Sequence, residues 1–142
     1  MVGHAQNTQS LLTSMVIEGV FEKFPTLKLI LVEAGFAWLP ALSWRLDKLW
    51  DRMRDEIPHV SRPPSQLIRE HVWLTTQPME EPEEPNQLLD TIEWIGWENL
   101  LFAPKNWISA THPDLAKFVP NSIESGPFWA DPGKICFLLP KT

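Results

Sequence analysis

The stretch Leu29–Gly35 reads Leu-Ile-Leu-Val-Glu-Ala-Gly and decides the fold class of this sequence. Its first four residues form a continuous apolar run, whereas a strand with one solvated face alternates between apolar and polar residues. Continuous apolar runs are typical of strands buried on both faces, as in parallel sheets covered by helices. The run therefore predicts an α/β protein in which a glutamate directly follows a buried strand.

Helical patterns flank this strand on both sides. Residues 7–24 carry apolar side chains at helical spacing; Thr8 and Ser10 can cap the start, and Pro25 ends the pattern. Residues 38–55 carry a second apolar stripe, and Pro40 suits the first turn of a helix because its missing N–H needs no partner there. The strand is thus expected between two helices.

The same alternation continues down the chain. Ser65 can cap a short helix that reaches residue 70. Further elements are expected as a strand at 71–76, an acidic loop at 77–85, a helix at 86–95 and a strand at 100–103. The order of three helix-strand units predicts two right-handed crossovers and a parallel sheet.

Residues 104–142 have a different character. Six of the chain's 14 prolines fall in this tail, and no helical period is sustained across it. Residues 114–119 are compatible with a turn or two of helix, and residues 135–139 with one strand. We therefore divide the chain into a regular α/β part, 1–103, and an irregular proline-rich tail, 104–142.

Composition and charge exclude several classes of partner. The formal net charge of −6 repels phosphate backbones, so we expect no nucleic acid, and no basic amphipathic stretch predicts a membrane surface. The single cysteine, Cys136, cannot form an intramolecular disulfide and is expected to be a small buried apolar residue. The first residues lack the pattern of a secretory signal, and a cytoplasmic location is expected.

The candidate site residues can be grouped by where they lie relative to the predicted strands. In α/β proteins with parallel sheets the chemistry lies at the carboxyl ends of the strands. Glu33, Thr76 and Gln77 follow strands and are expected on that face, and Trp38 begins the next helix on the same side. Glu33 is the candidate catalytic residue, and the other three are candidate substrate-face residues. The alternative for Glu33 is a carboxylate that binds nearby backbone N–H groups, and for Trp38 it is packing.

The histidines sort by the same rule. His71 begins a strand and His59 lies before one, so both are expected on the opposite face and neither is expected to bind metal. His4 and His112 remain compatible with the catalytic side. The carboxylates of the 77–85 loop are expected to be solvated, because the loop lacks the ligand spacing and turn glycine of a calcium site.

An ordered series of sequence blocks across residues 9–103 resembles a known family. The blocks are Leu12–Ser14, Glu18–Pro25 (Glu-Gly-Val-Phe-Glu-Lys-Phe-Pro), Leu31–Pro40 (Leu-Val-Glu-Ala-Gly-Phe-Ala-Trp-Leu-Pro), Trp44–Asp47, Pro64–Trp73, Thr75–Pro78 and Leu100–Ala103. They are similar to the amidohydrolase-related metal-dependent hydrolases and decarboxylases, in particular the relatives of aminocarboxymuconate-semialdehyde decarboxylase.

This resemblance implies a distorted (β/α)8 barrel, which needs about 250 residues when complete. The three strands here would be the sixth, seventh and eighth, so the sequence resembles the C-terminal half of the barrel. The family's metal ligands come from the first, fifth and sixth strands and from an aspartate after the eighth. Glu33 stands at the sixth-strand position and Lys105 at the position of the aspartate. An ammonium group cannot coordinate zinc, so the metal set is incomplete here.

The resemblance implies hydrolysis or decarboxylation of a small organic acid or ring compound, with a divalent metal such as zinc as the family's cofactor. For this chain alone we expect no bound metal and no activity. The alternative is a non-catalytic interaction module that docks on a partner half-barrel. With both sheet edges expected to be open, we expect self-association or a complementary barrel half. The abrupt end of the resemblance at Ala103 predicts that the tail arose by frameshift or gene rearrangement.

Overall fold

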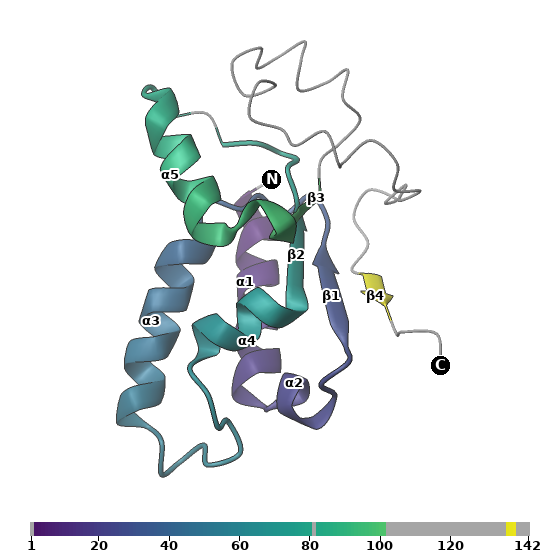
Figure 1. Cartoon of the computed structure of the whole chain (residues 1–142), viewed down its shortest axis with the longest axis vertical. Helices are drawn as coiled ribbons and strands as arrows, with labels where there is room; N and C mark the ends of the chain where they lie inside the picture. The colour runs from purple at the N-terminus through teal and green to yellow at the C-terminus, as the bar shows by residue number, and fades with distance from the viewer. Residues whose placement is uncertain (1, 81, 102–135, 139–142) are drawn as a thin grey trace.

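The computed structural model describes residues 2–80, 82–101 and 136–138. Its elements, in chain order, are α1 (Val2–Ile17), α2 (Val20–Lys23), β1 (Lys28–Leu31), α3 (Leu39–Arg52), α4 (Pro64–His71), β2 (Val72–Thr75), α5 (Pro85–Ile95), a short 3₁₀ turn (Trp97–Asn99), β3 (Leu100–Leu101) and β4 (Cys136–Leu138). Figure 1 shows the strands side by side, with α1, α3, α4 and α5 gathered on one side of them.

The strands form one sheet in the order β3-β2-β1-β4. β1 pairs in parallel with β2, with Leu29 opposite Val72, and β2 pairs in parallel with β3, with Leu74 opposite Leu100. The predicted parallel sheet is therefore present, and a three-stranded parallel sheet with helical crossovers is compatible with part of an α/β barrel.

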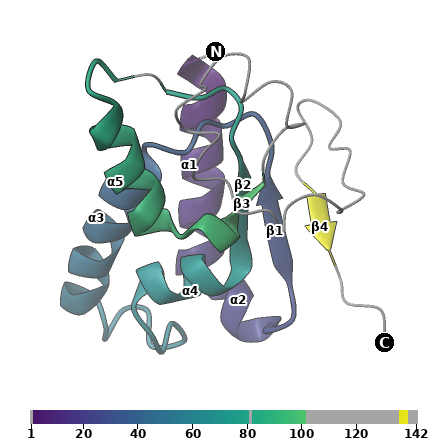
Figure 2. The same ribbon diagram turned by 45° about the horizontal axis from the view of Figure 1, so that its top comes forward.

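The fourth strand corrects the expectation that both sheet edges are open. β4 pairs with the outer edge of β1 in the antiparallel direction, with Leu29 opposite Phe137 and Ile30 opposite Cys136. Figure 2 shows β4 on the side of β1 away from β2. The expected strand at 135–139 is thus confirmed for its described residues, 136–138. The other expectations for the tail, including the turn at 114–119, His112 and Lys105, lie outside the described residues.

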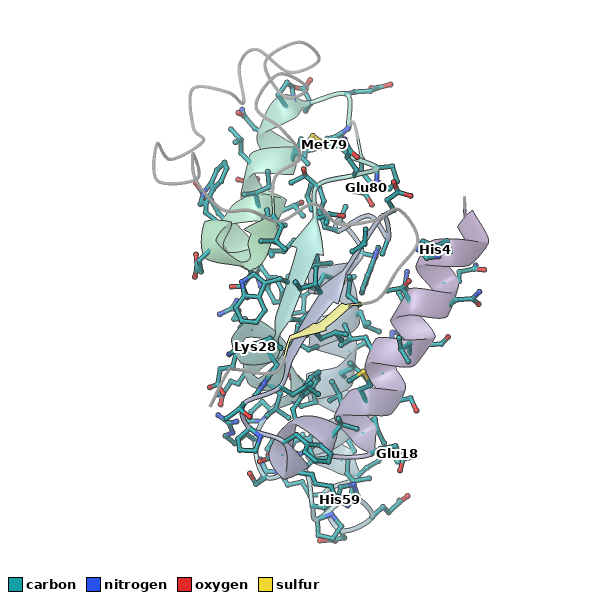
Figure 3. All side chains as sticks on the ribbon, turned by 90° about the vertical axis from the view of Figure 1, so that its right-hand side faces the viewer. His4, Glu18, Lys28, His59, Met79 and Glu80 are labelled. Atoms are coloured by element: carbon teal, nitrogen blue, oxygen red, sulfur yellow. The ribbon has the colours of Figure 1, made fainter. Side chains whose placement is uncertain are left out.

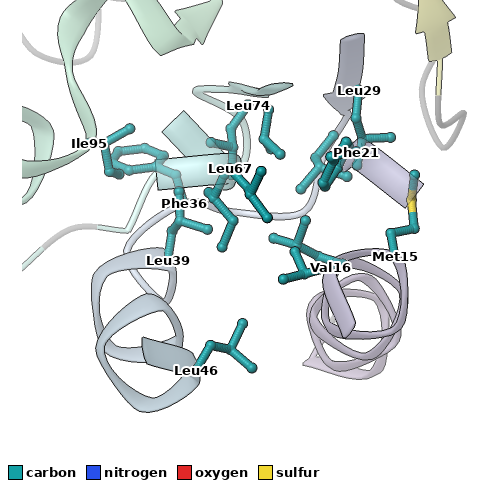
Figure 4. Close-up of a cluster of buried hydrophobic side chains, with 14 of the residues drawn as sticks. Met15, Val16, Phe21, Leu29, Phe36, Leu39, Leu46, Leu67, Leu74 and Ile95 are labelled. Carbon is teal, nitrogen blue, oxygen red and sulfur yellow. The ribbon is translucent and has the colours of Figure 1, made fainter. Parts of the chain in front are cut away.

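The main core lies between the sheet and the helices. Figure 4 shows Leu29 and Leu74 from the strands meeting Val16 of α1 and Leu39 of α3. All four side chains are buried. Burial of each such side chain contributes roughly 1.5–3 kcal/mol, so this layer fixes how β1 and β2 sit against the helices.

Two predicted helix starts were wrong because polar groups find other partners. α1 begins near Val2, and Thr8 lies inside it, where its hydroxyl donates to the carbonyl of His4 at 3.0 Å. The expected long helix also breaks at Gly19, whose φ of 69° belongs to the left-handed region, and α2 follows. Ser65 does not cap α4; instead its backbone N–H donates to the Asp47 carboxylate of α3 at 2.8 Å.

Candidate functional site

The carboxyl ends of β1 and β2 lie at one end of the molecule. Figure 3 places His4, Met79 and Glu80 towards this end, and Lys28, Glu18 and His59 towards the other. Lys28 is the first residue of β1, whereas Met79 and Glu80 follow β2. The polar residues that follow the strands therefore share the edge where α/β barrels place their chemistry.

Glu33 follows β1 in an unusual backbone conformation. Its φ is 53°, and it is the one described non-glycine residue with a positive φ. Its backbone N–H donates to the hydroxyl of Thr75 at 3.0 Å, and that hydroxyl donates to the carbonyl of Gln77 at 3.3 Å. The half-buried Glu33 carboxylate has no hydrogen bond or ion pair within the described part of the chain. The Glu33 backbone is thus held in place by a side chain of β2.

Thr76 and Gln77 lie beside this turn with different exposure. Thr76 is fully buried, and its backbone N–H donates to the carbonyl of Leu101 at 3.1 Å, which joins it to β3. Its hydroxyl has no hydrogen-bond partner among the described residues. Gln77 is half-buried and reaches the Glu33 turn through its backbone carbonyl, by way of the Thr75 hydroxyl.

Trp38 is anchored to the same turn. Its indole N–H donates to the carbonyl of Ala34 at 2.9 Å, and the side chain is half-buried against the core. The only polar atom of the indole side chain is therefore engaged in holding the β1–α3 connection. This contact favours packing as the main role of Trp38, although its ring still lies next to the Glu33 turn.

Glu80 departs from the expectation that the carboxylates of the 77–85 loop are solvated. Its two carboxylate oxygens accept a hydrogen bond from the backbone N–H of Phe36, at 3.2 and 3.3 Å. A Cβ atom at Gly35 would overlap this carboxylate, and the φ of Gly35 is 67°. The Gly-Phe pair after Glu33 was the available signal, because a glycine next to a strand end marks a close backbone approach.

Two surface hollows border these elements. The one next to the Glu33 turn has a volume of about 390 Å³ and is lined by Ala37, Glu80, Pro82, Gln87, Leu88 and Thr91. A larger one, about 600 Å³, lies between α1 and Leu42 of α3 and contains none of the predicted site residues. Glu80 thus faces a hollow, whereas Glu33 lines neither.

The three histidines of the described residues lie at the ends of the sheet that the strand order predicts for them. His71 is buried at the end of α4, donates from Nδ1 to the Leu27 carbonyl at 2.8 Å and stacks on Phe21. His59 contacts the carbonyl of Ile17 at 2.8 Å, at the opposite end from Glu80 (Figure 3). His4 lies towards the end that also holds Glu80 (Figure 3), where its Nε2 atom is 3.2 Å from the carbonyl of Val32.

The described residues do not by themselves form a metal-binding site. No group of three or more histidine, cysteine, aspartate or glutamate side chains is placed to hold one in residues 2–80, 82–101 and 136–138. Tight zinc sites use three or four protein ligands. Glu33 offers one oxygen donor at the strand ends, and no catalytic step through a metal follows from these residues alone.

Parallel strands joined by helical crossovers, with polar residues at their carboxyl ends, define an α/β protein whose sheet is compatible with part of a barrel. The family model described as "Amidohydrolase" matches residues 2–103, and the chain therefore belongs to the amidohydrolase family. This is a hydrolase-type family whose members are generally metal-dependent. No curated protein matches the chain. None of the described helices is long and apolar enough to cross a bilayer.

Proposed function

We propose that this chain forms part of a metal-dependent barrel enzyme and supplies the family's strands six to eight as β1, β2 and β3. By its sequence blocks it is similar to the relatives of aminocarboxymuconate-semialdehyde decarboxylase. The reaction would be hydrolysis or decarboxylation of a small organic acid or ring compound. Residues 1–103 carry the barrel portion, and residues 104–142 lie outside it in sequence, with Cys136–Leu138 pairing with β1 as β4. The chain is inactive alone.

The Glu33 turn supports this proposal most directly. A non-glycine residue in the left-handed region costs roughly 1–2 kcal/mol, and such conformations persist where surrounding contacts hold them. Here the Thr75 hydroxyl binds the Glu33 N–H at 3.0 Å. The carboxylate that this conformation presents has no hydrogen-bond or ion-pair partner in the described part of the chain, and we assign it the binding of a ligand, a substrate or a proton.

Completion of the site requires residues beyond those described. A divalent metal, when bound by a complete ligand set, would activate water or polarise a carboxylate-bearing substrate. Within this chain Glu33 would supply one oxygen donor or act as the acid-base group, while Thr76, Gln77 and Trp38 would border the substrate. The remaining ligands would come from further barrel strands.

The alternative function is a non-catalytic module that docks on a partner half-barrel. It is favoured by the incomplete ligand set among the described residues. It is also favoured by the edge of β1 away from β2, which pairs with a strand of three residues in the described structure. On this alternative Glu33 would have no chemical role, and assembly would need no metal.

Co-expression with an amidohydrolase-family polypeptide that ends after its fifth barrel strand tests both functions. The co-purified complex should hold zinc by metal analysis, and Glu33→Gln should lower its zinc affinity by about tenfold or more, in the range seen when metal-site residues change. Glu83→Gln, in the exposed loop, is the matched control. A complex that forms equally well without zinc and ignores Glu33→Gln would establish the docking module instead.

A further inference from the structure

The outer edge of β1 has the composition of an interior strand. Leu29, Ile30 and Leu31 are all buried, and Lys28 is the only charged residue of the strand. Natural edge strands are usually protected by charges, prolines or bulges, because their free N–H and C=O groups pair readily with other chains. A strand of this composition needs a neighbour on both sides.

The two edges of β1 pair with different kinds of strand. On one side β2 continues the parallel sheet that also contains β3. On the other side lies β4, a three-residue strand that runs antiparallel to β1. β4 is connected to β3 through residues 102–135, which contain Pro104, Pro113, Pro120, Pro127 and Pro132. It is therefore remote in sequence and short, whereas β2 is joined to β1 through packed helices.

The two faces of β1 also differ. Leu29 and Leu31 belong to the main core cluster, but Ile30 is buried outside it and so points to the other face of the sheet. Ile30 is the residue opposite Cys136. The β1 edge thus offers backbone hydrogen-bonding groups between two apolar faces, which is the arrangement that binds an added strand.

We propose that the outer edge of β1 is a docking site for an extended apolar strand of a partner polypeptide, and that β4 occupies it in the free chain. Cys136–Leu138 shows the chemistry that the edge accepts: an extended Cys-Phe-Leu segment bound through its backbone. The partner strand displaces β4 and extends the sheet. This inference rests on the proposed completion of the barrel by further strands, but its experiment measures neither metal nor activity, so it can fail separately from the role of Glu33.

The single cysteine provides a direct test of where β4 lies. Residues directly opposite in an antiparallel pair have Cα atoms about 4.5–5.5 Å apart, within the range that a disulfide spans. The full chain with Ile30→Cys should therefore form an intramolecular disulfide with Cys136 on mild oxidation, measured by mass and by loss of free thiol. Lys28→Cys is the matched control, because it stands diagonally to Cys136 at about 7–8 Å, too far for a disulfide.

The oxidised Ile30→Cys chain is then a locked form for a binding experiment. The probe is a fluorescent peptide with the sequence of residues 134–140 and serine in place of the cysteine. Phe137→Pro opens β4, because proline removes a backbone donor from the ladder. The peptide should bind Phe137→Pro at least about tenfold more tightly than the unmodified chain, where the tethered β4 competes at high effective concentration, and the locked form should not bind.

Any one of the following results would overturn the proposal. Failure of Ile30→Cys to form a disulfide, or disulfide-linked dimers in place of the intramolecular bond, would show that a chain's own β4 does not occupy its edge. Equal binding by the locked and opened forms, or no binding by the opened form, would show that the edge is not a docking site. Circular dichroism checks that each variant folds. Leu138→Pro replaces Phe137→Pro if that variant unfolds. The triple variant Lys28→Cys/Leu138→Cys/Cys136→Ser replaces the Ile30→Cys lock in the same way.

Discussion

At the scale of single residues, Glu33 combines a strained backbone with a carboxylate that has no partner in the described structure. Replacement by asparagine, which tolerates the left-handed region, removes part of that strain and loses no side-chain hydrogen bond or ion pair in the described residues. We expect Glu33→Asn to raise the free energy of unfolding by about 0.5–1 kcal/mol, measured by urea denaturation.

The control for this prediction is Glu83→Asn, in the exposed loop, which should change stability by less than about 0.5 kcal/mol. A loss of more than about 1 kcal/mol in Glu33→Asn would mean that the glutamate serves the fold. Stability gained by removing a residue is expected where that residue is kept for function.

Glu22 gives a residue-scale prediction that depends on pH. Its carboxylate accepts hydrogen bonds from the Ser61 hydroxyl at 2.8 Å and the Ser61 N–H at 3.0 Å. The hydroxyl bond is the main cause that lowers the pKa of Glu22 below its ordinary value of 4.5, against an opposing effect of burial. Because the pKa is lower in the folded state, the stabilisation is complete above the unfolded-state value and is lost as pH falls through the folded-state pKa.

The unmodified chain should therefore lose more stability between pH 6 and pH 3 than Glu22→Gln does. Urea denaturation at both ends of this range measures the difference. Glu18→Gln, at an exposed position, should follow the unmodified chain. Identical pH profiles for Glu22→Gln and the unmodified chain would show that this contact does not contribute.

At the scale of elements, Glu80 ties the loop after β2 to the turn after β1. Its carboxylate is the hydrogen-bond acceptor for the N–H of Phe36, whose side chain is fully buried. A backbone N–H left without a partner costs roughly 1–3 kcal/mol. We expect Glu80→Ala to lower the free energy of unfolding by about 1–2 kcal/mol, and Glu80→Gln, which keeps an acceptor oxygen, by less than half of that.

Glu83→Ala, three residues further along the same loop, is the control and should be nearly neutral. Amide hydrogen exchange adds a local readout: the Phe36 N–H should exchange faster in Glu80→Ala, with β2 unchanged. Equal losses in the alanine and glutamine variants would assign the effect to packing and not to the hydrogen bond.

The elements that could be predicted from sequence are those fixed by local chemistry. The apolar run before Glu33 predicted β1, and Pro40 lies in the first turn of α3 as expected. The starts of α1 and α4 were wrong, because their polar groups are satisfied by partners that spacing does not reveal. Asp47, which binds the Ser65 N–H, comes from a different helix.

The features of the candidate site also fall into two groups, those that the sequence predicts and those that it does not. Positions at strand ends follow from the order of elements, so Glu33, Thr76 and Gln77 could be placed on one edge in advance. The hydrogen-bond partners at this edge could not be predicted, because the Thr75–Glu33 and Glu80–Phe36 contacts join segments more than forty residues apart in sequence. A glutamate among prolines and other glutamates carries no local sign that it will bind a backbone N–H elsewhere.

At the scale of the whole molecule, the pairing of β4 with β1 was the least predictable feature. Residues 135–139 could be recognised as a strand from composition, but not assigned a partner or a direction. A strand pairs through backbone groups, which every residue carries, so the choice of edge depends on which edge the rest of the fold leaves available. The antiparallel β4 therefore depends on the parallel β1–β2–β3 unit as a whole.

Whether the isolated chain binds zinc depends on all the candidate ligands that it contains. Glu33 is a single oxygen donor at the strand ends, His4 Nε2 lies 3.2 Å from the Val32 carbonyl, and no set of three ligands exists in the described residues. Because tight zinc sites use three or four ligands, the isolated chain should bind no zinc stoichiometrically. Isothermal titration calorimetry with zinc alone should show no saturable heat, and metal analysis after dialysis should find less than one zinc per chain.

Thermal unfolding with and without EDTA is the companion measurement, since a ligand that binds only the folded state raises its stability. The midpoint should be the same in both conditions, and His4→Ala should change neither the calorimetry nor the EDTA comparison. A stoichiometric zinc site of micromolar affinity or better would contradict the proposal that this chain depends on further strands for its metal. Loss of that site in both His4→Ala and Glu33→Gln would place it at the carboxyl ends of the strands and make the chain a metal-binding unit by itself.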